Sequence, residues 1–89
     1  MRRRTDKTKA LRLHFWKNTL FIMRRMGLCE YEFANLCNYS ENSFHAARSK
    51  GCLSLDMAII ICEQLAEPLD DMFYTDYESA YKAEGSGVE

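Results

Sequence analysis

A short stretch of the chain, residues 40–50, gathers hydroxyl, carboxylate, amide, imidazole and cationic side chains. The amide of Asn42 can form two hydrogen bonds with the edge of an adenine base, and the imidazole of His45 can donate or accept one. The carboxylate of Glu41 can accept a bond from the amino group of cytosine. Arg48 and Lys50 close the stretch with charges that suit phosphate groups. These groups favour recognition of a ligand over the making or breaking of covalent bonds.

The sequence shows no arrangement typical of a catalytic centre. His14 and His45 fall in different predicted helices, and no serine, cysteine or acidic residue has the helical spacing that would place it beside either with an orienting third group. The four cysteines form no C-x-x-C pair and match no common zinc spacing. We therefore expect a protein that is not an enzyme and that holds neither a metal ion nor a cofactor.

The polar stretch begins at the corner of a predicted helix-turn-helix. Helices are expected over residues 30–37 and 41–49. Asn38 lies in the corner, where a tight turn needs a residue that tolerates positive φ. Ser40 is placed to cap the second helix, which is expected to bury Phe44. A small helix pair of this shape typically presents its second helix to the major groove of DNA.

Further helices and two flexible ends complete the predicted domain, which is all-α and compact, with five helices. The other three helices are expected over residues 10–26, 55–67 and 69–73. We divide the chain into a flexible basic arm (residues 1–9), a helix-turn-helix domain (residues 10–83) and a frayed, disordered tail (residues 84–89).

Helical spacing also predicts which side chains form the core. In the first helix the buried stripe is expected to be Leu11, Phe15, Ile22 and Met26, with Trp16, Leu20 and Met23 on its flank. In the helix over residues 55–67 the expected stripe is Leu55, Ile59, Cys62 and either Leu65 or Ala66.

Charge is distributed very unevenly along the chain. Residues 1–25 hold nine basic residues and one acidic residue, a net charge of +8, whereas residues 26–89 hold three basic and twelve acidic residues, a net charge of −9. A basic arm on an acidic body suits contact with phosphate or with an acidic partner. No apolar run is long enough to predict a membrane span or a signal peptide. With four free thiols, we expect a cytoplasmic protein.

Residues 13–73, about two-thirds of the chain, resemble the lambda-repressor-like (Cro/C1, Xre-type) helix-turn-helix family. The residues that carry the resemblance are Gly27-Leu28, Glu32-Phe33-Ala34, Ser40, Phe44, Ser54-Leu55, Leu65-Ala66 and Leu69-Asp70-Asp71-Met72-Phe73. The resemblance implies five helices, DNA binding through the third helix and, often, a two-fold dimer on a palindromic operator.

The resemblance also implies which positions would meet DNA. Base edges would face Glu41, Asn42, His45 and Ala46, phosphates would lie near Ser40 and Ser43, and the DNA backbone would lie near Arg48 and Lys50. Two positions depart from the family pattern. Glu30 stands where a neutral polar residue usually touches phosphate, and Ala46 offers only a methyl group. The basic side chains of Arg2, Arg3 and Arg4 could supply the missing charge by reaching the minor groove.

Two functions are consistent with these residues. The favoured one is a sequence-specific transcriptional regulator, a repressor of phage or mobile-element type that binds double-stranded DNA as a homodimer. The alternative is a helix-turn-helix scaffold repurposed to bind a protein, as in an anti-CRISPR or other host-defence inhibitor or an antitoxin. Its protein partner would meet the acidic surface of Glu30, Glu32 and Glu41. The tyrosines at positions 74, 77 and 81 either complete the core or form a dimer seam.

Overall fold

The computed structural model describes the backbone of residues 2–88 and the side chains of residues 8–82. Within this range the chain is all-helical and has no strand. The elements are α1 (Arg2–Arg25), α2 (Glu30–Leu36), α3 (Glu41–Lys50), α4 (Leu55–Leu65), α5 (Leu69–Tyr74) and α6 (Tyr77–Val88). The all-α prediction is confirmed, but the expected number of five helices is wrong, because the residues after α5 form a sixth.

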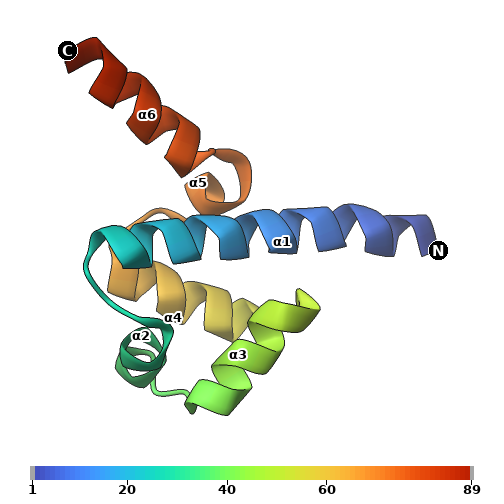
Figure 1. Ribbon diagram of the computed structural model, residues 1–89. Helices are drawn as coiled ribbons and strands as arrows, with labels where there is room; N and C mark the ends of the chain where they lie inside the picture. The colour runs from blue at the N-terminus through green and yellow to red at the C-terminus, as the bar shows by residue number, and fades with distance from the viewer. Residues whose placement is uncertain (1, 89) are drawn as a thin grey trace.

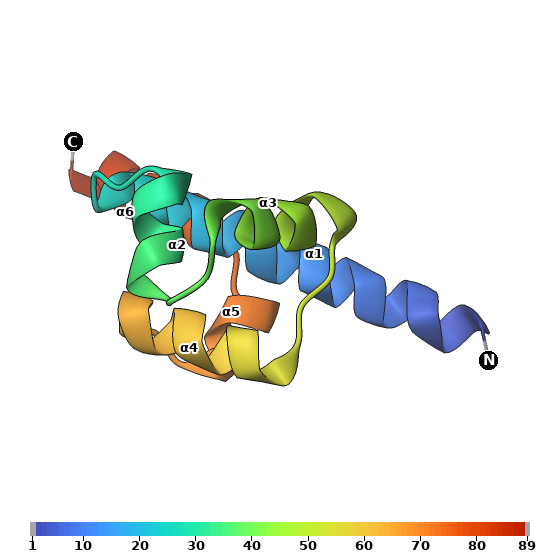
Figure 2. The same cartoon turned by 90° about the horizontal axis from the view of Figure 1, so that it is seen from below.

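The long helix α1 organises the molecule. It separates the group formed by α2, α3 and α4 from α6, and α5 packs against both α1 and α4 (Figure 1). Its first turns project beyond the other helices in both views (Figure 2). Helix α1 begins at Arg2, eight residues before the predicted start at residue 10. Most of the segment expected to be a flexible arm is therefore helical backbone continuous with the domain.

Aromatic side chains from α1, α2 and α3 form the centre of the core. Phe15, Phe33 and Phe44 are fully buried. The ring of Trp16 packs edge-on against Phe44 with centroids 5.1 Å apart, and Phe33 meets the same ring at 5.8 Å. Such edge-to-face pairs stabilise a core beyond the area that they bury. Phe44 thus fixes α3 against both α1 and α2, and Trp16 belongs to the core rather than to an exposed binding surface.

Residues in the left-handed region end several helices. Gly27, Asn38 and Gly51 have φ values of +80°, +65° and +72°. The prediction that Asn38 makes the corner between α2 and α3 is confirmed. Ala66, at +59°, ends α4 at Leu65, two residues earlier than expected. A non-glycine residue in this conformation carries a local strain.

The predicted buried stripe of α4 is partly wrong. Leu55 and Ile59 are exposed, whereas the side chains that face the core are Met57, Ala58, Ile61, Cys62 and Leu65. Apolar residues occur on most sides of this helix, so two stripes satisfy helical spacing and the sequence alone does not choose between them. In α1 the same ambiguity leaves Met26 half exposed, while Trp16 and Met23, expected on the flank, are buried.

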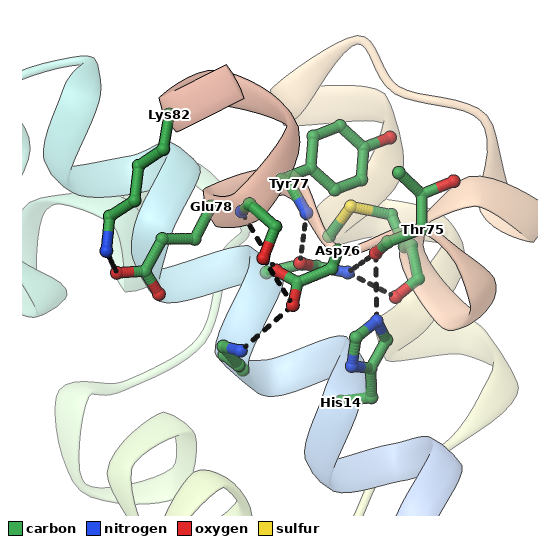
Figure 3. Close-up of polar contacts among 10 residues, drawn as sticks. His14, Thr75, Asp76, Tyr77, Glu78 and Lys82 are labelled. Atoms are coloured by element: carbon green, nitrogen blue, oxygen red, sulfur yellow. Dashed lines mark hydrogen bonds and ion pairs between the residues drawn. The ribbon is translucent and has the colours of Figure 1, made fainter. Parts of the chain in front are cut away.

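A buried amide joins α1 to α5 and α6. Asn18 is 1% exposed, and its Nδ2 donates to the carbonyl oxygens of Met72 and Thr75 at 2.8 Å each. Its Oδ1 accepts from the N–H of Tyr77 at 3.2 Å, and His14 Nε2 donates to the Thr75 oxygen at 2.8 Å (Figure 3). We call these five residues the Asn18 junction. It satisfies the backbone groups where the chain leaves α5 and enters α6.

Helix α6 begins with an acidic cap that sequence spacing did not reveal. Asp76 Oδ1 accepts from the N–H of Ser79 at 3.2 Å, and Asp76 Oδ2 pairs with Lys17 of α1 at 3.4 Å (Figure 3). The cap satisfies an N–H group that the helix itself cannot. Tyr74, Tyr77 and Tyr81 do not form one stripe, because Tyr74 lies at the end of α5 and the other two lie on α6. Over the described residues, no helix has the length and apolar character required to cross a bilayer.

Candidate nucleic-acid interface

Helix α3 is held by one face and leaves the other open to solvent. Ser40 caps the helix by accepting from the N–H of Ser43 at 3.1 Å, and Phe44 anchors it in the core. Ala47 is half-buried beside this anchor. The opposite side is exposed and is called here the α3 surface, which consists of Glu41, Asn42, Ser43, His45, Ala46, Ser49 and Lys50. All four residues predicted to face base edges lie on this surface.

The two serines predicted to lie near phosphates bond to each other. The hydroxyl of Ser40 donates to the hydroxyl of Ser43 at 3.0 Å, while also accepting from the Ser43 N–H. Both side chains are exposed. A hydroxyl can exchange such a bond for one to a phosphate oxygen at little cost, because the exchange leaves no buried group unpaired.

Arg48 turns back onto α2. Its Nε donates to Oε2 of Glu30 at 2.5 Å, and its Nη2 reaches Oε1 of the same carboxylate at 3.5 Å. His45 Nδ1 lies 3.3 Å from that Oε1 and 3.0 Å from Arg48 Nη2, and His45 Nε2 lies 3.3 Å from the hydroxyl of Ser49. We call Glu30, His45, Arg48 and Ser49 the Glu30 cluster. It joins the first residue of α2 to the outward side of α3.

The cluster stabilises the charged form of Glu30. Partial burial would raise the pKa of this carboxyl, but hydrogen bonds and charge from Arg48 and His45 outweigh burial and hold its pKa below the usual 4.5. At neutral pH Glu30 is therefore an ion-paired carboxylate. At this phosphate-facing position Glu30 therefore repels phosphate less than an unpaired carboxylate would, because Arg48 already compensates its charge.

Few free cations remain on the α3 surface. Lys50 is exposed and, among the described side chains, has no carboxylate within ion-pair distance. Glu32 accepts from the N–H of Cys29 at 2.9 Å, and this bond to the start of its own helix lowers the pKa of Glu32. Glu41 is exposed at the first turn of α3. The charge of this face is therefore close to balanced, and strong attraction to phosphate would have to come from elsewhere.

Basic residues of α1 lie directly beside the C-terminal end of α3. Arg12 Nε donates to the carbonyl oxygen of Gly51 at 2.8 Å, and a Cβ at Gly51 would lie 2.9 Å from Leu13 Cδ2 and 3.9 Å from Lys9 Cε. Gly51 is thus needed both for its positive φ and for this close approach. The contact joins the basic N-terminal part of α1 to the end of α3 at Lys50. The side chains of Arg2, Arg3 and Arg4 lie outside the described range, on the helical backbone that continues from Lys9.

The cysteines divide by burial. Cys37 and Cys62 are buried, whereas Cys29 and Cys52 are exposed, and all four are free. Burial raises the pKa of the Cys37 thiol to about 11, which keeps it protonated and unreactive. Within the described residues, no group of three or more potential metal ligands comes together.

Sequence reasoning does not find the Glu30 cluster, because Glu30 and Arg48 are 18 residues apart and no local spacing links them. Comparison with family models, curated proteins and solved structures finds no match to this chain. The resemblance to the lambda-repressor-like family therefore rests on the residues themselves.

Proposed function

We propose that the protein is a sequence-specific, DNA-binding transcriptional regulator whose helix α3 enters the major groove. The proposal depends on one observation, the exposed polar face of α3. Phe44 holds the opposite face of this helix in the core, and Ser40 caps its start. A rigid helix after a tight corner is the geometry that major-groove readers share. Asn42 is exposed on that face, and its amide can pair with adenine.

In this proposal α1 supplies the attraction that α3 lacks. Arg12 and Lys9 lie beside the end of α3, and six of the first twelve residues are basic. Phosphate contacts dominate the affinity of most DNA-binding proteins, so these residues would set overall affinity while α3 sets sequence preference. The helical start of α1 favours contact along the phosphate backbone over the threading of a flexible arm into the minor groove.

The biological setting is carried over from the resemblance alone. A repressor of phage or mobile-element type would act in the cytoplasm by occupying a promoter as a homodimer. Exposed apolar side chains at Leu55 (67% exposed) and Tyr74 (74% exposed) offer surface that a second copy would cover.

A second candidate function is binding of a protein partner through the acidic side of the same face. The observation that favours it is the Glu30–Arg48 pair, which removes one of the two cations that α3 could offer to DNA. Glu32 and Glu41 remain exposed there. In this reading the helix-turn-helix is a scaffold for an anti-CRISPR-like inhibitor or an antitoxin.

Selection from a pool of randomised duplexes, followed by fluorescence anisotropy at low and near-physiological salt, tests the proposal. A DNA regulator should enrich a defined sequence and bind it more tightly than random duplex. Asn42→Ala should reduce that preference, whereas Gln64→Ala, which removes an exposed amide from α4, should not. Absence of binding even at low salt would reject the DNA function and favour the protein-binding scaffold.

A further inference from the structure

The Glu30 cluster contains one atom that two partners cannot use at the same time. His45 Nδ1 lies 3.0 Å from Arg48 Nη2, which can only donate, and 3.3 Å from Glu30 Oε1, which at neutral pH can only accept. Nδ1 accepts from Arg48 when it carries no proton and donates to Glu30 when it does. The cluster therefore has two hydrogen-bonding arrangements, and one proton decides between them.

From this geometry we infer that Glu30 is a positioning residue that withholds Arg48 from DNA phosphate, and that protonation of His45 releases Arg48. The inference rests on the proposed function. When neutral His45 carries its proton on Nε2, Arg48 is held by both oxygens of Glu30 and by Nδ1. When His45 is protonated, Nδ1 no longer accepts from Arg48. The protonated Nδ1 then competes with Arg48 for Oε1 of Glu30, and the positively charged ring lies beside the Arg48 guanidinium.

The exposures of the three side chains suit this exchange. The side chain of His45 is 56% exposed, so protons reach it directly from solvent, whereas Glu30 and Arg48 are 21% and 27% exposed. Arg48 lies at the edge of the α3 surface, and release needs only a side-chain rotation, since the backbone of α3 remains anchored by Phe44. Arg48 would thus be available as one more cation for duplex DNA when His45 is charged.

Other charged groups line the surroundings of the cluster. Arg24 of α1 and Cys29 at the start of α2 line the hollow beside Glu30 and Arg48, and Lys17 of α1 and Glu78 of α6 line the adjoining one. Glu41 precedes His45 by one turn of α3. Among these side-chain types, only histidine ordinarily changes charge between about pH 5 and pH 8. The second histidine, His14, lies in the Asn18 junction. A change in DNA affinity across that range therefore reports on the cluster only where Glu30→Gln alters it.

The first arm of the test needs no DNA. Imidazole ¹⁵N shifts of His45, recorded by NMR at a fixed pH, should differ between Glu30→Gln and the wild type, because these shifts report the hydrogen bonding of Nδ1. Loss of the accepting carboxylate removes the partner of the charged ring and leaves Arg48 beside it. Glu32→Gln is the matched control, because Glu32 bonds to Cys29 and not to the cluster. Unchanged imidazole ¹⁵N shifts of His45 in Glu30→Gln would overturn the inference.

The second arm measures affinity for random duplex by anisotropy. Glu30→Gln should bind about fivefold more tightly at low salt, the upper range for one exposed charge interaction. The slope of log affinity against log salt should steepen by about 0.9, as expected for one additional phosphate contact. The wild-type protein should bind more tightly at pH 5.5 than at pH 8. Protonation of His45 adds a charge to the α3 surface in Glu30→Gln as well, so both proteins should bind more tightly at acidic pH. The advantage of Glu30→Gln over the wild type should shrink from pH 8 to pH 5.5, because Arg48 is already released in the variant. Glu32→Gln should retain the wild-type pH dependence and salt slope.

The outcomes separate this inference from the proposed function. DNA binding by Glu30→Gln that is no tighter than that of the wild type at pH 8 would overturn the positioning role and leave the DNA function standing. No binding of DNA by either protein would overturn both.

Discussion

The Asn18 junction and the Glu30 cluster are built from similar groups, an imidazole and a side-chain amide or carboxylate bonded between helices, yet they differ in burial. Asn18 is 1% exposed, and all of its hydrogen-bonding partners are backbone groups of α5, of α6 and of Thr75 between them. The Glu30 cluster lies at the surface, and its partners are other side chains. Backbone partners are fixed by the fold, whereas side chains can rotate to meet a ligand.

This difference separates a structural network from a candidate functional one. Breaking a bond at the Asn18 junction leaves a buried polar group unpaired, which is costly. Breaking a bond at the Glu30 cluster exposes the freed group to water or to phosphate, which costs little. The same chemistry therefore holds α6 in place on one side of α1 and leaves α3 free to exchange partners on the other.

The largest expected effect is on stability at the buried network. Asn18→Ala removes three hydrogen bonds. It leaves the Met72 carbonyl oxygen and the Tyr77 N–H without a side-chain partner, while the Thr75 oxygen keeps its bond from His14. The substitution should lower the free energy of unfolding by about 3 kcal/mol. Urea denaturation measures the change. Lys17→Ala, next along α1, breaks only the exposed pair with Asp76 and should cost less than about 1 kcal/mol. Equal losses in the two variants would contradict the distinction drawn from burial.

Replacing the first three arginines of α1 should have the next largest effect. A triple variant with Arg2, Arg3 and Arg4 changed to glutamine keeps similar helix propensity but removes three charges. Affinity for every duplex should fall about a hundredfold at low salt, and the salt slope should flatten by about 2.7. Anisotropy over a salt series measures both. Lys82→Gln, on α6, is the charge control, and an unchanged slope in the triple variant would remove the start of α1 from the interface.

Asn42→Ala should cost about 1–3 kcal/mol of binding free energy on the selected duplex and relax one base position. The fold should be unaffected, because Asn42 is exposed and α3 is anchored elsewhere. Anisotropy against the selected duplex and its single-base variants makes the measurement. If affinity falls equally on all sequences, Asn42 does not read bases.

The smallest effect is the acid sensitivity contributed by Glu30. Its pKa is lowered in the folded protein, so its contribution to stability is present above the ordinary value of 4.5 and is lost as pH falls through the lowered value. Glu30→Gln should flatten the decline in stability between about pH 5 and pH 3 by no more than about 1 kcal/mol. Thermal unfolding across this range tests the sign. Glu63→Gln, on the exposed face of α4, is the control and should follow the wild-type profile.

Local signals in the sequence predict local structure well. Ser40 caps the helix that it was expected to cap, and Asn38 takes the positive φ that the corner requires. Ser54 caps α4 in the same way. Each of these features depends on a few neighbouring residues. Helix α6 was not predicted as a separate element, although residues 75–83 were placed inside the domain. The i, i+3 relation of Asp76 and Ser79 was the available signal.

Long-range pairing is what the sequence does not determine. The partners of Asn18 lie 54 to 59 residues away, and Glu30 finds Arg48 only because α2 and α3 cross at the corner. The residues of the α3 surface were predictable from helical spacing. The pairing that sets the charge of that surface depends on tertiary packing, which spacing does not encode.

The most direct test of the central claim is an NMR titration of the ¹⁵N-labelled protein with a short duplex at low salt. The account predicts that amide signals of Asn42, His45 and Lys50 shift together with those of the first turns of α1, while Asn18 and Tyr77 remain in place. Shifts confined to α6, or no shifts with any duplex, would contradict the assignment of α3 and α1 as the DNA-binding surface.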